Sequence, residues 1–432
     1  MRKIIPAIII TSIFIVSALR TCWSGDDDVS VNNAKTEQPI PIDNALRLRT
    51  DSFIAAQKSV GSLGIMLYDI TAGQPVYEYN ANVPMRPASC LKLLSCIAAM
   101  RTVGTGYRYR TRLYLDGNII NDTLRGDVIL KTQFDPAFNR DSLSILLGAL
   151  KQRNIKAVKG RVLLDMAFIE PMNHEQHWIA GDLKTSRMGL IYHGYRKMRI
   201  ETLYGLMSAA HINVNIDSIR FGRLVPRRAI KIAEISTPLH YAVEKALKNS
   251  SNINAETLLY LLGYTADTGG NFRHNGVMAL RRFIREELKM NPDKVSHIDD
   301  GCGLCPDNRM TPLLLIELLK YAHKHKSIYS EMMQCLPSSG TDGTLHDRMT
   351  KPYLQGRIKA KTGTLTREGG ISTLAGYFTG ADGHLIAFAI MNNECPVMDG
   401  RWWQDKICEK AFLPNDNTSN RQARQEYKKA AR

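Results

Sequence analysis

The stretch PASCLKLLSCIAAM, residues 87–100, decides the fold assignment, and it contains the S-x-x-K pattern Ser89-Cys90-Leu91-Lys92. Apolar residues recur in it at helical spacing, which predicts a helix from Cys90 to about Met100 with Ser89 at its start. Residues three apart lie on one face of a helix, so the Lys92 amine is expected to reach the Ser89 hydroxyl. A serine hydroxyl is a weak nucleophile until a base takes its proton, and a lysine of lowered pKa can do so. The pattern therefore indicates nucleophilic catalysis.

Two further short motifs follow along the chain. Ser250-Ser251-Asn252 stands near the end of a helical pattern, and it offers a hydroxyl that can relay a proton and an amide that can hold a substrate backbone. Lys361-Thr362-Gly363-Thr364 lies in a predicted strand, where a glycine lets another backbone approach. Such a strand suits an extended peptide that lies along a sheet edge and ends in a carboxylate. The first two motifs are weak alone and the third is more specific, and the three together point to one site.

The surrounding sequence alternates between strand and helix patterns. Residues 62–79 predict a β-hairpin, and residues 107–115, 127–130 and 161–165 predict short strands, with a turn at Asp116-Gly117-Asn118. Helical periodicity occupies residues 238–262, 276–288 and 312–324. The chain closes with predicted strands at residues 356–361, 373–379 and 384–391. The strand-rich stretch 107–232 is interpreted as an insertion between two parts of a core.

These motifs, in this order, resemble those of the low-molecular-mass class C penicillin-binding proteins, which are D-alanyl-D-alanine carboxypeptidases and endopeptidases. The resemblance covers roughly residues 60 to 390. It extends to the segments 248–256 (KNSSNINAE), Asp300-Gly301 with Gly303-Leu304 and Asn308-Arg309, and 336–345 (LPSSGTDGTL). It implies an α+β fold, with a β-lactamase/transpeptidase-like core of antiparallel sheet and helices that carries a β-rich inserted domain.

The resemblance also implies a role for each motif residue. Ser89 would be the acylated nucleophile and Lys92 its general base, Ser250 would relay protons, and Asn252 would contact the substrate. Lys361 would complete the proton and charge network, while Thr362, Gly363 and Thr364 would bind the terminal carboxylate and main chain. Backbone N–H groups of Ser89 and Thr364 would form the oxyanion hole. The implied activity is cleavage of peptidoglycan stem peptides through an acyl-enzyme, with β-lactams as covalent inhibitors and no metal or cofactor.

The N-terminus indicates export. Met1-Arg2-Lys3 is a positive start before the uncharged stretch Ile4–Leu19, which is short for a bilayer span, so residues 1–22 are interpreted as a secretory signal. Cys22 is followed by small and acidic residues, as in bacterial lipoproteins, but Arg20 departs from the usual small residue. Lipidation of Cys22, simple cleavage and an uncleaved anchor stay open. We expect a periplasmic or cell-envelope protein, with membrane association through the N-terminus.

Composition excludes several classes of protein. The 432 residues include 57 Lys+Arg and 41 Asp+Glu, a net charge of +16, and are 44% hydrophobic, which excludes collagen, coiled coil and wholesale disorder. Export and the lack of a recognisable binding module argue against nucleic acid as a partner. The basic tail, residues 413–432, is interpreted as a solvated segment; the alternative is attraction to anionic lipid or cell-wall polymer.

The sequence thus predicts five segments: a signal at 1–22, a linker at 23–45, a catalytic core formed by 46–106 and 233–412, the insertion at 107–232, and the tail at 413–432. Two other functions on the same scaffold are considered, a serine β-lactamase or esterase and a non-catalytic cell-wall-binding module. Glu170-Pro171-Met172-Asn173 superficially resembles a deacylating segment of class A β-lactamases, but it stands on the wrong side of Ser250. The intact Ser89, Lys92, Ser250, Asn252 and Lys361 argue against a purely binding role.

Cysteine and histidine patterns offer weaker alternatives. Cys302-Gly303-Leu304-Cys305 is a C-x-x-C, which we interpret as a loop pair or a disulfide rather than a zinc or redox centre, because neither a second C-x-x-C nor a βαβ pattern accompanies it. His174 and His177 are interpreted as surface residues, because no third metal ligand is evident nearby.

Overall fold

The computed structural model of the protein describes residues 40–57, 61–166, 168, 172, 189–222, 225–268, 271–367 and 369–411. The predicted signal, most of the linker, and the tail lie outside these residues, as do Cys22, His174 and His177. Of the Glu170–Asn173 segment, only Met172 is described. The described residues from Ile40 onward form one compact unit by their contacts.

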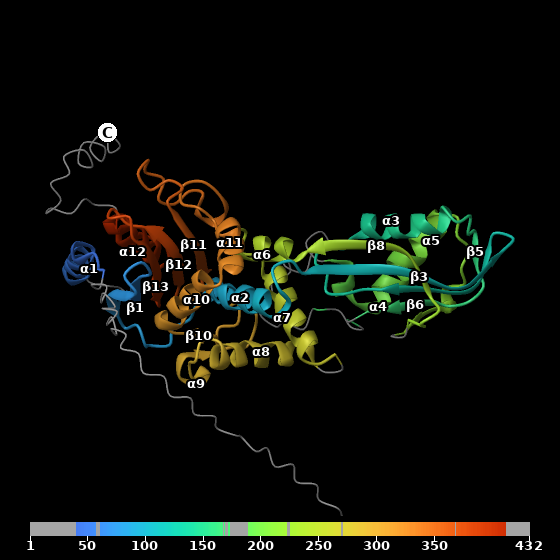
Figure 1. The fold of residues 1–432 in the computed structure, drawn as a ribbon, viewed down its shortest axis with the longest axis horizontal. Coiled ribbons are helices and arrows are strands. Elements are labelled where there is room, and N and C mark those ends of the chain that lie inside the picture. Colours follow the sequence, from blue (N-terminus) through green and yellow to red (C-terminus); the bar gives the residue numbers. More distant parts are fainter. Residues whose placement is uncertain are drawn as a thin grey trace, which may run out of the picture. The chain divides into compact units, whose positions relative to one another are not determined.

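A five-stranded antiparallel sheet carries the core of the fold (Figure 1). Its strands follow the order β11 (Ile358–Leu365), β12 (Ile371–Thr379), β13 (Leu385–Asn393), β1 (Ser62–Asp69) and β2 (Gln74–Tyr79). The strands at residues 62–79 and the three C-terminal strands were predicted from their alternation and turns, and the hairpin β1–β2 is confirmed. The first and last parts of the described chain therefore pair in one sheet.

Both faces of this sheet are covered, which explains its almost continuous apolar strands. Helices α1 (Asn44–Ala56) and α12 (Val397–Ala411) cover one face, where Leu46 and Trp403 join a buried cluster with Ile65 and Leu67. Met66 points the opposite way and packs in the larger cluster with α2 (Lys92–Val103) and α10 (Pro312–Lys324). Alternate residues of β1 thus pack into two different hydrophobic cores, one on each face of the sheet.

The remaining core helices lie beyond the second face. They are α6 (Leu239–Leu247), α7 (Asn252–Ala266), α8 (Phe272–Glu286), α9 (Pro292–Val295) and α11 (Lys326–Cys335), with the small ladder β9 (Ser296–His297) and β10 (Arg309–Met310). The prediction of one continuous helical pattern over 238–262 is wrong in detail. The helix breaks at residues 248–251, where Ser250 adopts a positive φ of 57° that no helix tolerates. By contrast, α10 has the bounds that the sequence predicted.

A second, six-stranded sheet contains β3 (Arg108–Ile120), β4 (Thr123–Lys131), β5 (Ala157–Val158), β6 (Val162–Asp165), β7 (Ile219–Phe221) and β8 (Ile230–Pro238). It also packs against α3 (Arg140–Lys151), α4 (Gly194–Lys197) and α5 (Gly205–Ala209), of which the sequence predicted none. The predicted turn at 116–118 is wrong, because β3 continues through it to Ile120. Gly117 instead pairs with Gly126 across the ladder, where an added Cβ would lie 2.6 Å from the partner's Cα.

The fold class predicted from the sequence is confirmed: the core is an α+β assembly of antiparallel sheet and helices, and the chain also contains a second, strand-rich sheet. Among the described residues, no helix is both long and apolar enough to cross a bilayer.

Candidate active site

Ser89 lies in a 3₁₀ turn, Ala88–Leu91, that leads directly into α2. The turn is strained, since Ala88 has a φ of 44°, and such strain persists only where the surroundings hold it. Here β12 holds it: the Thr373 hydroxyl donates to the Pro87 carbonyl (2.7 Å). The buried Cys90 thiol donates to the Lys361 carbonyl (3.2 Å), so the turn is also fixed to β11. These contacts leave Ser89 half-buried at the start of the helix, as the sequence predicted.

Lys92 is fully buried one turn away, and its Nζ makes three short polar contacts. It lies 2.8 Å from Ser89 Oγ, 2.9 Å from Asn252 Oδ1 and 2.7 Å from the Cys302 carbonyl oxygen. The side-chain oxygen of Asn252 and the carbonyl oxygen of Cys302 can only accept hydrogen bonds. A neutral Lys92 amine therefore donates its two N–H groups to these oxygens, and its lone pair faces the Ser89 O–H. The geometry brings the Lys92 amine into hydrogen-bond contact with the Ser89 hydroxyl, as the predicted pairing of base and nucleophile requires.

Burial lowers the pKa of Lys92, because a charged amine loses its hydration in the interior. The nearby carboxylates of Asp300 and Glu256 act in the opposite direction. A lowered pKa increases the fraction of neutral Lys92 near neutral pH, which is the form that can accept a proton.

The loop that presents the Cys302 carbonyl is organised by one buried carboxylate, that of Asp300. It accepts from three backbone N–H groups and one amide side chain, those of Gly303, Leu304, Cys305 and Asn308. The loop also touches the nucleophile turn, since a Cβ added at Gly303 would lie 1.9 Å from the Ala88 carbonyl oxygen. Asp300 therefore fixes a hydrogen-bond partner of Lys92 from outside the site.

Ser250 and Asn252 reach the site because the chain breaks between α6 and α7. Ser251 caps α7 through its hydroxyl, which accepts from the Asn254 backbone N–H (3.4 Å). Asn252 is then the first residue of α7, and its side-chain oxygen meets Lys92. Ser250, held at positive φ, presents its hydroxyl to Lys361 Nζ at 2.9 Å. The middle residue of the S-x-N motif thus has a structural role of its own.

Lys361 lies on β11 and is fully buried. Loss of hydration lowers its pKa to about 7, and the positive charge of Lys92 acts in the same direction. Its ammonium group donates to Ser250 Oγ and to the Thr362 carbonyl (2.6 Å). A lysine whose pKa is lowered into this range can both take and give a proton near neutral pH.

The remaining motif residues line β11. Thr362 donates its hydroxyl to Thr344 Oγ1 (2.7 Å), and the half-buried Thr364 accepts from Arg401 Nη2 (3.4 Å). Gly363 permits the close approach of the strand to the nucleophile turn, because an added Cβ would lie 1.9 Å from Thr373 Oγ1 and 2.6 Å from the Pro87 carbonyl oxygen. The structure thus gathers all eight predicted site residues around Ser89 and β11.

Two residues near the site were not singled out from the sequence. Thr344 stands in the quoted segment 336–345, so that segment was a usable signal. No sequence signal pointed to Arg401, because it lies on α12 and contacts Thr364 only in the folded protein. Burial lowers the pKa of Arg401, and the neighbouring Arg348 adds to this effect, while Asp405 acts in the opposite direction. A positive charge thus stands beside Thr364.

The cysteines of the described chain are all free thiols. Of the two interpretations offered for Cys302 and Cys305, a loop pair or a disulfide, the structure therefore shows the loop pair. Burial raises the pKa of Cys305 to about 11 and that of Cys302 well above its usual range, which leaves both protonated and unreactive near neutral pH. Glu256, Asp300 and Cys302 bring possible ligand atoms within 4.8 Å of one another, but the Asp300 oxygens already accept the four hydrogen bonds of the loop.

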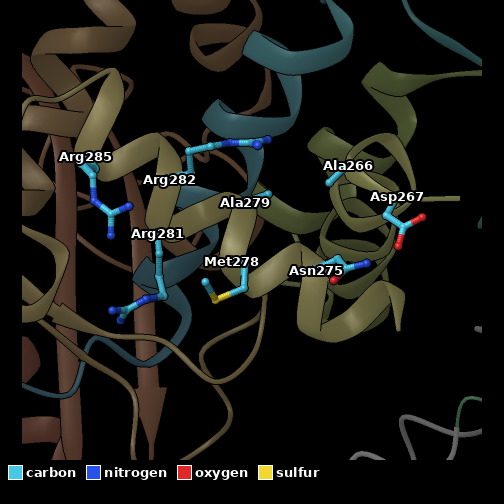
Figure 2. A pocket seen from close by; sticks show the side chains of 8 residues that line it. All are labelled: Ala266, Asp267, Asn275, Met278, Ala279, Arg281, Arg282 and Arg285. Carbon is cyan, nitrogen blue, oxygen red and sulfur yellow. The ribbon is translucent and has the colours of Figure 1, made fainter. Parts of the chain in front are cut away.

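A pocket on α8 contrasts with this site. It has a volume of about 290 Å³ and includes Arg281, Arg282 and Arg285 in its lining. Figure 2 shows the three guanidinium groups pointing in different directions rather than toward one point. Arg281 is moreover ion-paired with Asp293. The pocket therefore does not concentrate positive charge as an anion site would.

Comparison with known proteins identifies the family. A model described as the D-Ala-D-Ala carboxypeptidase 3 (S13) family matches residues 49–191 and 217–410. The chain belongs to this family. It is accordingly a D-Ala-D-Ala carboxypeptidase, a hydrolase, and the resemblance to low-molecular-mass class C penicillin-binding proteins is confirmed.

Relatives of this S13 enzyme agree with the assignment. It is 22% identical over 412 residues to the D-alanyl-D-alanine carboxypeptidase DacB of Haemophilus influenzae, covering 76% of this chain and 84% of the relative. Its fold is similar to that of penicillin binding protein 4 of Haemophilus influenzae complexed with a β-lactam, with a TM-score of 0.67 and 20% identity. The match covers 84% of this chain and 100% of that structure. It is also similar in fold to Bd3459, a predatory peptidoglycan endopeptidase of Bdellovibrio bacteriovorus, with a TM-score of 0.57 and 17% identity. This match covers 82% of this chain and 92% of that structure.

Proposed function

We propose that this S13 enzyme cleaves peptidoglycan stem peptides through an acyl-enzyme at Ser89. The observation that carries the proposal is the 2.8 Å contact between Ser89 Oγ and the buried Nζ of Lys92, whose two other partners are both acceptors. Neutral Lys92 takes the Ser89 proton while Oγ attacks the carbonyl carbon of the penultimate D-alanine. The oxygen of the tetrahedral intermediate receives hydrogen bonds from the backbone N–H groups of Ser89 and Thr364.

The leaving group departs with a proton from the second lysine. Ser250 Oγ lies 2.9 Å from Lys361 Nζ, and the pKa of about 7 allows that lysine to supply a proton through the Ser250 hydroxyl to the departing nitrogen. The C–N bond breaks, D-alanine leaves as a free amine, and the acyl group stays on Ser89 as an ester. The proton that Lys92 took from Ser89 passes on to Lys361, which restores the starting protonation of both lysines. Neutral Lys92 then deprotonates a water, which attacks the ester, and the shortened peptide leaves with a new carboxylate while Ser89 regains its proton from Lys92.

Binding of the substrate terminus is assigned to β11 and α12. The substrate lies extended beside β11, with Asn252 contacting its backbone and the hydroxyls of Thr362 and Thr364 reaching its carboxylate. Arg401 stands behind Thr364 as the positive charge that the carboxylate compensates. A charge-assisted hydrogen bond of this kind is stronger than a neutral one. Removal of a cross-linking amine, the endopeptidase reaction, uses the same steps with a different leaving group.

The test is product analysis with a stem pentapeptide. Wild-type enzyme should release one D-alanine per peptide, detectable by mass spectrometry of the shortened product. Ser89→Ala should keep the fold, since Ser89 lies at the edge of the site, and should release none. Continued hydrolysis by Ser89→Ala would refute the nucleophile assignment. Release of hydrolysed β-lactam at a rate exceeding peptide cleavage would favour the β-lactamase alternative.

Location and domain organisation belong to the same proposal. Family membership is consistent with a cell-envelope enzyme, and we place the mature protein in the periplasm or at the envelope, after a signal at residues 1–22 and with Cys22 as the residue that lipidation would modify. Mass analysis of the mature N-terminus distinguishes lipidation, cleavage and an uncleaved anchor. The segments 46–106 and 233–412 are proposed as the catalytic core and 107–232 as the insertion, with β-lactams as covalent inhibitors.

A further inference from the structure

A second cavity lies between the six-stranded sheet and the ends of α7 and α8. Its volume is about 290 Å³, close to the lower end of the roughly 300–1,000 Å³ typical of small-molecule sites. It contains none of the motif residues: its lining includes Tyr107, Phe134, Tyr264, Phe272, Lys131 and Asp165. Tyr264 follows Asn252 by twelve residues on α7, which places this cavity about 18 Å along the helix from the candidate active site.

The cavity occupies a position where sheets commonly bind ligands. Strands β4 and β6 are parallel, and Lys131 and Asp165 are paired at their carboxyl ends. Crevices at the carboxyl ends of parallel strands are recurrent ligand sites, because side chains from neighbouring strands converge there. The cavity opens at this edge, so it is built by the sheet topology rather than by a surface loop alone.

One side of the cavity is aromatic. Phe134, Tyr264 and Phe272 contact one another edge-to-face, with ring centroids 5.3–5.7 Å apart. Phe134 is buried, whereas Tyr107, Tyr264 and Phe272 are only half-buried, so part of each of these rings is left to face a ligand. Such rings offer flat apolar surface with a polar hydroxyl at the rim of each tyrosine.

The lining of the cavity also includes polar groups. Lys131 Nζ lies 3.8 Å from Asp165 Oδ2, too far for a hydrogen bond, so the ammonium group keeps donors for a ligand. The Gln133 side-chain oxygen accepts from the Arg110 backbone N–H (2.6 Å), which orients the amide and leaves its nitrogen as the donor end. A purely apolar ligand would desolvate these groups without replacing their hydrogen bonds. The negative charge of the Asp165 carboxylate would repel a ligand that carries a phosphate group.

We propose that this cavity binds an N-acetylated amino sugar of the peptidoglycan glycan strand. The inference rests on the proposed function, because that substrate carries its peptides on such sugars. A pyranose ring has an apolar C–H face that can stack on the half-buried aromatic rings, and hydroxyl and acetamide oxygens that can accept from Lys131 and Gln133. The cavity would then hold the glycan while a stem peptide reaches Ser89.

The test measures binding of a chitin tetrasaccharide to the full chain carrying Ser89→Ala, by saturation-transfer NMR with a titrated Kd. Tyr264→Ala should raise the Kd about tenfold or more, since it removes an aromatic surface on which the sugar stacks. Two control variants should keep the Kd within about twofold of that of the parent protein. Tyr264→Phe keeps the ring, and Tyr79→Ala removes an exposed tyrosine from β2. Lys131→Met tests the polar groups and should also weaken binding.

Equal affinities of Tyr264→Ala and Tyr79→Ala, or no binding by the parent protein, would overturn the inference. In a Ser89-containing background, acylation by a β-lactam reports whether each variant is folded. The inference can fail while that acylation and D-alanine release persist, in which case the proposed function stands. Conversely, saccharide binding with Ser89-independent hydrolysis would contradict only the proposed function.

Discussion

At the scale of single residues, the proposed mechanism depends on Lys92 and Lys361, two buried lysines whose pKa values are lowered by burial. The neutral form of Lys92 is the reactive one, so activity should rise with pH as this lysine loses its proton. Glu256 raises the pKa of Lys92 through its charge, while its Oε1 accepts from the Gly301 backbone N–H (2.7 Å). The two functions of Glu256 can be separated, because a glutamine oxygen can still accept that bond.

Glu256→Gln should therefore move the acidic limb of the pH profile. With the negative charge gone, the protonated form of Lys92 is less stabilised and its pKa falls further, so the limb of kcat/KM shifts to lower pH. Steady-state kinetics of D-alanine release between about pH 5 and 9 measures this shift. A limb displaced to higher pH, or unmoved with normal activity, would contradict the role of neutral Lys92.

Arg401 should matter only for substrates that carry a terminal carboxylate. Arg401→Met is expected to lower kcat/KM for a D-Ala-D-Ala peptide roughly ten- to a hundredfold, as expected for a lost charge-assisted hydrogen bond. The same peptide with an amidated terminus should show little further loss, and Arg401→Lys should restore part of the activity. Lys406→Met, on the same helix and paired with Glu409, is the matched control. An equal loss for both peptides would indicate a structural role instead.

At the scale of elements, the site depends on the close packing of the nucleophile turn against β11. Gly363→Ala should push the turn away, because its Cβ would overlap Thr373 Oγ1 and approach the Pro87 carbonyl oxygen. We expect destabilisation on the order of 2 kcal/mol or more together with loss of acylation. Thermal unfolding and β-lactam labelling measure both effects.

Gly148→Ala is the control for that substitution. Gly148 lies in the middle of α3, where an added Cβ meets nothing within 4 Å. Alanine is favoured over glycine in a helix interior by up to about 1 kcal/mol, so this variant should unfold at an equal or higher temperature. A Gly363→Ala enzyme as stable and active as Gly148→Ala would disprove the packing argument.

Sequence patterns predicted the elements whose signals are local. The helix α10 begins with a Thr311 cap and Pro312 at its first position, and its bounds were correct. The break at Ser250 was missed because a serine at positive φ has no sequence signal. The turn at Gly117 was wrongly predicted because that glycine serves a close strand pairing rather than a turn. Arg401 was missed because only the packing of α12 brings it to Thr364.

At the scale of the whole molecule, the excess of positive charge favours anionic partners. The chain carries 57 Lys+Arg against 41 Asp+Glu, with part of the excess in residues 413–432. Deleting those residues should reduce co-sedimentation with peptidoglycan sacculi or anionic vesicles at low salt, and the difference should vanish above about 0.5 M salt because of screening. Cleavage of a soluble pentapeptide should not change. Equal sedimentation of both forms would support the solvated-tail interpretation.

The central claim is that three distant segments meet to make Ser89 a nucleophile with Lys92 as its base. The most direct measurement is the mass of the intact protein after exposure to penicillin, followed by peptide mapping. We expect one covalent adduct, located on Ser89, that is absent from Ser89→Ala and forms at least about a thousandfold more slowly in Lys92→Met. An adduct on another residue, or undiminished labelling of Lys92→Met, would contradict it.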